Sequence, residues 1–215
     1  MEKENLLANA RTFAAALLKI GAVQLRPEQP FTWASGWKSP IYCDNRVVLS
    51  YPEIRTQVIS GLVDLTRTLP PFDVIAGVAT AGIPHGALLA DRLQLPFAYV
   101  RAQAKSHGRQ NLIEGRIEKG QRVLVVEDLI STGGSSLQAV HALREAGCEV
   151  AALAALFTYG FPQADIAFRE AGCAFSTLSR YEILVEEALK TGYIKKEHQE
   201  LLSRWRENPA VWGSV

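Results

Sequence analysis

Apolar positions follow strand and helix periodicities in turn through the middle of the chain. Between residues 72 and 178, short apolar runs alternate with amphipathic segments. The predicted strands are 74–78, 97–100, 123–126, 150–157 and 174–178, and the predicted helices are 85–93, 135–146 and 162–171. This alternation predicts an α/β fold with a mainly parallel twisted sheet flanked by helices. Ligands of such sheets bind at the carboxyl ends of the strands.

The N-terminal third has a different pattern. Residues 3–20 have the apolar spacing of an amphipathic helix. Segment 23–44 is rich in aromatic residues and turn formers, which predicts short extended pieces. Ser50-Tyr51-Pro52-Glu53 has the form of a capping box and predicts a helix from there to about residue 68.

The C-terminal part reads as two further helices, 181–191 and 195–206. There is no internal repeat and no low-complexity linker. We therefore expect one structural domain, made of an N-terminal helix and hood at 1–71, a core at 72–180 and C-terminal helices at 181–215.

Composition and charge narrow the possible classes of protein. The 215 residues are 48% hydrophobic and 21% charged, with a net charge of +1, which favours neither nucleic acid nor an anionic membrane as partner. The three cysteines are scattered, which argues against a disulfide framework and a structural zinc site, and the histidines have no metal-ligand spacing. The N-terminus is charged and no apolar run is long enough to span a bilayer, so we expect a cytoplasmic protein.

The strongest candidate for chemistry is the stretch 123–136, Val-Leu-Val-Val-Glu-Asp-Leu-Ile-Ser-Thr-Gly-Gly-Ser-Ser. A buried strand leads into two carboxylates, Glu127 and Asp128, and then into a small-residue loop before a helix. The N–H groups of such a loop suit a phosphate, and Gly133 and Gly134 let the backbone approach it. Carboxylates beside a phosphate cradle fit a ligand that also carries hydroxyls or magnesium, such as a ribose phosphate. An ordinary strand-turn-helix is the alternative, and it would be preferred for a lone Gly-Gly pair.

Two other segments carry candidate binding residues. Residues 101–118 are polar, contain several cations and are too long for a routine connection, so they form either a functional lid or a solvated loop. Trp33, Trp37 and Tyr42 either stack on a flat ligand or simply pack against one another.

The stretch Val125–Ser135 resembles the phosphoribosyl-pyrophosphate (PRPP) signature of the type I phosphoribosyltransferases. Segments 31–44, 79–84, 101–108 and 111–115 narrow this to a resemblance to the orotate phosphoribosyltransferase family across nearly the whole chain. The resemblance implies the type I phosphoribosyltransferase fold and transfer of ribose 5-phosphate from PRPP to orotate, giving orotidine 5′-monophosphate and pyrophosphate, with Mg²⁺. That reaction belongs to de novo pyrimidine (UMP) biosynthesis.

The resemblance also assigns roles to individual residues. Glu127 and Asp128 match the pair that holds the ribose hydroxyls, Ser131–Ser135 match the 5′-phosphate loop, and Ala79–Gly82 match the pyrophosphate loop. The catalytic residues it implies are Lys105, His107 and Asp128. The full set of implied PRPP-binding residues is Arg101, Lys105, His107, Glu127, Asp128, Leu129, Ile130, Ser131, Thr132, Gly133, Gly134 and Ser135, with Thr80, Ala81 and Gly82 at the pyrophosphate.

The acceptor site is less fully specified. Ser131 matches the family's position for orotate contact, and Tyr42, Arg46 and Lys38 are our candidates for the remaining contacts. Tyr159 stands where some members carry an arginine that touches orotate. The same members carry lysines at the positions of Ala34, Ala81 and Ala102. These differences place more of the anion binding on Arg101, Lys105 and backbone amides.

These residue types suit the implied chemistry. Displacing pyrophosphate builds positive charge on the ribose and negative charge on the leaving group, so cations should act on the pyrophosphate. Lys105 supplies a compact charge, Arg101 a bidentate fork and His107 a proton or hydrogen bond. Magnesium is expected to be held mainly by PRPP and water, with no direct protein ligand. In the family the lid reaches into the neighbouring subunit, which implies a homodimer with Arg101, Lys105 and His107 acting in trans.

Two alternatives remain open. A purine phosphoribosyltransferase shares the stretch 123–136 but should differ in the hood and in the segment after 150. A PRPP-sensing transcription regulator should lack the lid cations and carry a basic DNA-binding segment, which residues 1–71 do not show.

Overall fold

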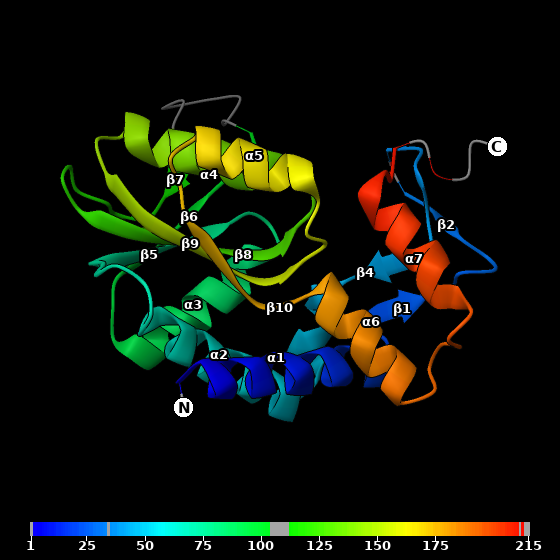
Figure 1. Cartoon of the computed structure of the whole chain (residues 1–215). Helices are drawn as coiled ribbons and strands as arrows, with labels where there is room; N and C mark the ends of the chain where they lie inside the picture. The colour runs from blue at the N-terminus through cyan, green and yellow to red at the C-terminus, as the bar shows by residue number, and fades with distance from the viewer. Residues whose placement is uncertain (1, 34, 104–111, 211, 213–215) are drawn as a thin grey trace.

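The computed structural model describes residues 2–33, 35–103, 112–210 and 212. Its centre is a six-stranded sheet with the order β10-β9-β8-β5-β6-β7, seen in Figure 1. Neighbouring strands run parallel except β7, which pairs antiparallel with β6 at one edge, so the predicted mainly parallel sheet is confirmed. The strands are β5 (Val74–Val78), β6 (Phe97–Val100), β7 (Ile113–Glu114), β8 (Arg122–Ile130), β9 (Glu149–Thr158) and β10 (Phe175–Arg180).

Helices cover both faces of the sheet because the central strand β8 sends apolar side chains to each face in turn. Val123 and Val125 pack in a buried cluster with α4 and α5. Leu124 and Val126 pack in a second cluster with α1, α2 and α3, and Figure 1 shows these two groups of helices on opposite sides of the sheet. The helices are α1 (Glu2–Lys19), α2 (Pro52–Thr66), α3 (Gly82–Leu93), α4 (Gly134–Glu145) and α5 (Pro162–Glu170).

The segment 23–50, which we call the hood, contains two small antiparallel sheets and a 3-10 helix, η1 (Asn45–Ser50). Two C-terminal helices, α6 (Tyr181–Lys190) and α7 (His198–Glu207), follow the main sheet. Ile41 of the hood and Trp205 of α7 belong to the same buried cluster as α1, so one core joins both ends of the chain. The hood strands are β1 (Val23–Leu25) with β4 (Ile41–Cys43), and β2 (Phe31–Thr32) with β3 (Lys38–Ser39).

Several element boundaries differ from the sequence prediction. α2 begins at Pro52 after Tyr51, which makes no side-chain capping bond, while Ser50 ends η1, so the predicted capping box is wrong. α3 begins at Gly82 rather than at 85, and α7 begins at His198 rather than at 195. β8 continues past Val126 because it keeps pairing with β9 through the acidic pair. None of the helices that the structure describes is long and apolar enough to cross a membrane.

Candidate active site

The acidic pair occupies the last part of β8. The Glu127 carboxyl contacts the start of α4 through Ser135 and Ser136. The Asp128 backbone contacts the hood through Asn45. The two carboxyls also hydrogen-bond each other, so they form one acidic centre between the main sheet and the hood.

Glu127 is 4% exposed, and its hydrogen bonds within the described residues tie it to the start of α4 and to its own strand. The Asp128 N–H donates to Oε1 at 3.0 Å. The Ser136 and Ser135 hydroxyls donate to Oε2 at 3.2 and 3.4 Å. Burial, and then the charge of Asp128, raise the pKa of Glu127 to about 8. Its predicted contact with the ribose stays a prediction.

Asp128 lies at the junction of the main sheet and the hood. The Nδ2 group of Asn45 donates a 2.8 Å hydrogen bond to the Asp128 carbonyl oxygen. Burial raises the pKa of the Asp128 carboxyl, while the side-chain hydrogen bond with Glu127, backbone hydrogen bonds and the nearby charge of Arg46 act in the opposite direction. This half-buried carboxylate is accordingly the member of the pair with more access to a ligand.

The predicted 5′-phosphate loop joins β8 to α4. Gly133 caps the helix with a φ of +87°, and a Cβ at this position would lie 2.8 Å from the ring of Phe168, so glycine is required there. Among the described residues no side chain caps α4, which leaves its first N–H groups for an anion. The loop is anchored at Ile130, whose carbonyl oxygen accepts hydrogen bonds from the Tyr159 N–H at 3.1 Å and the Thr158 hydroxyl at 3.2 Å.

The predicted pyrophosphate loop joins β5 to α3, next to the phosphate loop. Its first residue, Ala79, donates a backbone hydrogen bond of 2.8 Å to Val100 of β6, and the Ala79–Thr80 peptide bond is cis. Gly82 packs so closely on β8 that a Cβ would collide with the carbonyl oxygen of Val126. Because β5 and β8 are parallel neighbours, the two loops leave the sheet side by side.

The predicted lid begins where β6 ends, but its C-terminal part belongs to the sheet. Ile113 and Glu114 form β7 against β6, and the Arg101 N–H donates to the Leu112 carbonyl at 2.8 Å. The predicted boundary at 118 is therefore wrong. Nη1 of Arg101 lies 3.6 Å from Oε1 of Glu114, so this cation is already paired at the base of the lid. The other two lid residues, Lys105 and His107, lie outside the described residues.

The hood residues that we predicted to contact orotate lie beside other residues of the hood. Arg46 forms a bidentate pair with Asp44, with contacts of 2.6 and 2.8 Å, and Lys38 Nζ donates to the Thr32 hydroxyl at 2.8 Å. Tyr42 is 41% exposed. Of the aromatic residues proposed to stack on a ligand, Trp33 and Trp37 stack on each other, with ring centroids 6.4 Å apart. Their packing role is thus observed.

Sequence reasoning missed several residues that shape the site. Asn45 and Ser136 are fully buried polar residues, one fixing the Asp128 backbone and the other the Glu127 carboxylate. Tyr159, which the sequence analysis did single out, is buried and stacks on Trp33. Placing Ser136 near Glu127 from the sequence would have required knowing that β8 ends at Ile130. Asn45 has no comparable local signal, because its partner is 83 residues away.

The phosphoribosyl transferase domain model matches residues 67–175, which span the three loops. A curated relative, the orotate phosphoribosyltransferase of Cytophaga hutchinsonii, is 58% identical over 200 residues, covering 93% of this chain and 96% of the relative. The chain belongs to the orotate phosphoribosyltransferase family. The resemblance of the sequence to this family and its fold is thereby confirmed.

Solved structures agree with membership of the orotate phosphoribosyltransferase family. The Aeropyrum pernix orotate phosphoribosyltransferase is 31% identical with a TM-score of 0.73, covering 85% of this chain and 99% of that one. The Mycobacterium tuberculosis orotate phosphoribosyltransferase in complex with PRPP is 26% identical with a TM-score of 0.64, covering 82% of this chain and 99% of that one.

Proposed function

We propose that this chain is a pentosyltransferase that transfers ribose 5-phosphate from PRPP to orotate. The products are orotidine 5′-monophosphate and pyrophosphate, a step of pyrimidine nucleotide synthesis. Relatives that carry this activity in their names match over almost the full length, which supports orotate as the acceptor. The PRPP complex of the tuberculosis protein supports the donor.

The observation that carries the proposal is the meeting of the acidic pair with two anion-binding loops at the carboxyl ends of β5 and β8. We assign the 5′-phosphate to Ser131–Ser135 and the start of α4, and the pyrophosphate to Thr80–Gly82. Asp128, between them and the hood, holds the ribose hydroxyls. Glu127 supports the phosphate loop through Ser136 and contributes to the ribose site through Asp128.

The leaving group requires positive charge that the sheet itself does not supply. We assign this to Arg101, Lys105 and His107, since departing pyrophosphate gains negative charge as the ribose becomes cationic. Binding of PRPP has to take Arg101 from its ion pair with Glu114 or share it. A closed lid would also exclude water that otherwise hydrolyses the sugar phosphate.

Magnesium fits this site as a companion of the donor. Carboxylate oxygens are ligands that Mg²⁺ prefers, but those of Glu127 already accept three hydrogen bonds from the protein. We propose that PRPP and water hold the ion near Asp128, where it neutralises charge on the pyrophosphate.

We propose that the acceptor base binds under the hood. Its proposed contacts are Ser131, Tyr42, Lys38 and Arg46. We further propose a cytoplasmic homodimer in which each lid serves the neighbouring site. The parts 1–71, 72–180 and 181–215 act as one structural domain, in keeping with the core that joins hood, sheet and α7.

The direct test is to incubate the protein with orotate, PRPP and Mg²⁺ and to follow formation of orotidine 5′-monophosphate. Product should require all three components and should fall by at least about a hundredfold in Asp128→Asn, because the ribose loses a charged partner. Absence of product from a folded wild-type protein would overturn the proposal.

A further inference from the structure

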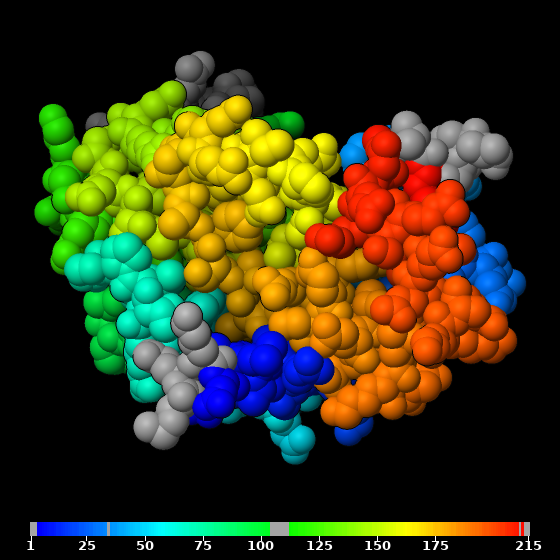
Figure 2. Space-filling model, viewed as in Figure 1, coloured from blue at the N-terminus to red at the C-terminus, as the bar shows by residue number. Residues whose placement is uncertain are grey.

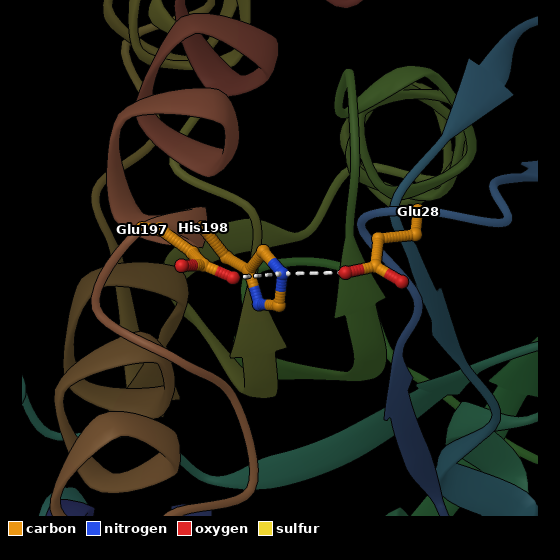
Figure 3. Close-up of side chains that lie close together, drawn as sticks. All are labelled: Glu28, Glu197 and His198. Carbon is orange, nitrogen blue, oxygen red and sulfur yellow. Dashed lines mark hydrogen bonds and ion pairs between the residues drawn. The ribbon is translucent and has the colours of Figure 1, made fainter.

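The C-terminal helix α7 contacts the hood at two separate points. Near its start, Nε2 of His198 lies 3.2 Å from Oε1 of Glu28, in the connection between β1 and β2 (Figure 3). Farther along, the ring of Trp205 lies 5.7 Å from that of Trp33, edge to face. Figure 2 shows the red atoms of α7 beside the blue atoms of the hood. The two contacts are about two helical turns apart, so one rigid element spans both.

The contact at Glu28 is a hydrogen-bonded attachment. One potential metal-ligating atom from each of Glu28, Glu197 and His198 lies within 4.8 Å of the other two. The sequence did not suggest this group. However, Nδ1 of His198 accepts the Lys195 N–H at 3.2 Å. A neutral ring then carries its proton on Nε2, where a metal would have to bind, and donates it to Glu28.

Helix α7 also contacts the loop that follows β9. The Trp205 ring lies 5.7 Å from Tyr159 and 5.3 Å from Phe161. Nη1 of Arg206 donates to the Gly160 carbonyl oxygen at 3.1 Å. Trp205 is therefore the residue at which hood, β9 loop and C-terminal helix meet.

The ring of Trp205 matters more than its N–H group. The side chain is fully buried, and Nε1 has no hydrogen-bond partner within the described part of the chain. A buried donor without a partner is unfavourable, so packing of the ring must outweigh that cost. Phenylalanine would keep ring contacts and lose no hydrogen bond, which makes it a matched control.

We propose that α7 is a brace that positions the hood over the acceptor-base site, with Trp205 and His198 as positioning residues. The inference rests on the proposed function, in which the hood contacts orotate. The phosphate loop has supports of its own, the Glu127–Ser136 bond and the packing of Gly133 on Phe168. Loosening α7 should therefore weaken orotate binding far more than PRPP binding.

The test compares Trp205→Leu with Trp205→Phe in the full chain. Trp205→Leu should raise the KM for orotate about tenfold, while the Kd for PRPP, measured by calorimetry, stays within about twofold. Trp205→Phe should recover most of the loss. Arg11→Gln, which breaks the Arg11–Glu187 pair between α1 and α6, controls for general destabilisation and should leave both constants unchanged.

Hydrogen exchange gives a readout that does not depend on the acceptor. Amides of 31–43 should exchange faster in Trp205→Leu, and those of β8 should not. His198→Ala, at the start of α7, removes the donor to Glu28 and should raise both the KM for orotate and the exchange rate at 31–43 by about twofold. This variant serves if Trp205→Leu does not fold. Unchanged exchange at 31–43, or equal losses for both substrates, would overturn the brace. A protein inactive with orotate but showing the exchange pattern would overturn the proposed function alone.

Discussion

Glu127 and Asp128 are neighbours in sequence, and each has a different partner elsewhere in the fold. The Glu127 carboxyl accepts from the Ser135 and Ser136 hydroxyls, and the Asp128 backbone carbonyl accepts from Asn45 of the hood. The two carboxyls also hydrogen-bond each other. One residue of the pair thus supports the start of α4, and the other joins β8 to the hood.

The raised pKa of Glu127 predicts a pH-dependent stability. The folded state keeps a proton up to pH about 8, which the unfolded chain releases near pH 4.5, so Glu127 lowers the unfolding free energy as pH rises through this window. One such group contributes a slope of at most about 1.4 kcal/mol per pH unit. The measurement is urea unfolding of wild type and Glu127→Gln at several pH values. The unfolding free energy of wild type minus that of Glu127→Gln should show this slope.

The comparison with Glu127→Gln is needed because His85 changes the stability of the protein with pH in the opposite direction. Burial lowers the pKa of His85 to about 4, so its contribution to stability is lost as pH falls below its ordinary value near 6.5. Equal pH slopes for wild type and Glu127→Gln would contradict the account of Glu127.

At the scale of elements, the site depends on how closely α3 packs against β8. A Cβ on Gly82 would collide with the Val126 carbonyl oxygen and approach the Glu127 Cα, whereas nothing lies within 4 Å of a Cβ on Gly134. Gly82→Ala should lower the unfolding free energy by about 2 kcal/mol, as overpacking does, and Gly134→Ala should not. Denaturant melts of both variants provide the comparison. Equal stabilities would mean that α3 shifts freely on the sheet.

The existence of the core elements was predictable, since strands buried on both faces are strongly apolar. The ends of elements were less so. β8 continues through the two carboxylates because β9 pairs with it there. Local sequence alone predicts that the strand ends at the first polar residue. For the same reason Ile113 and Glu114 were assigned to the lid, although pairing with β6 makes them a strand.

At the scale of the molecule, contacts between distant segments complete the site. Asn45 reaches Asp128 across 83 residues, and Trp33 meets Trp205 across most of the chain. Local patterns do not encode such pairs, because any buried asparagine or tryptophan would look the same in sequence. The family motifs were enough to predict a phosphate loop and an acidic pair, while the contacts that support the hood required coordinates.

The proposed shared sites predict complementation between inactive variants. An Asp128→Asn chain retains a working lid, and a Lys105→Ala chain retains a working ribose site. Hybrid dimers formed by subunit exchange should regain roughly a quarter to a half of wild-type activity, because one of two sites per hybrid is intact. Activity assays after mixing, with exchange verified by mass spectrometry, would detect it. No recovery despite exchange would place the lid in its own subunit's site.

The central claim is that orotate is the acceptor of ribose 5-phosphate. Its most direct measurement is a competition in one tube, with Mg²⁺, limiting PRPP and equal concentrations of orotate, adenine and hypoxanthine, followed by identification of the nucleotide formed. The account predicts orotidine 5′-monophosphate as the dominant product, with pyrophosphate released in equal amount. A purine nucleotide as the main product, with orotate untouched, would contradict it.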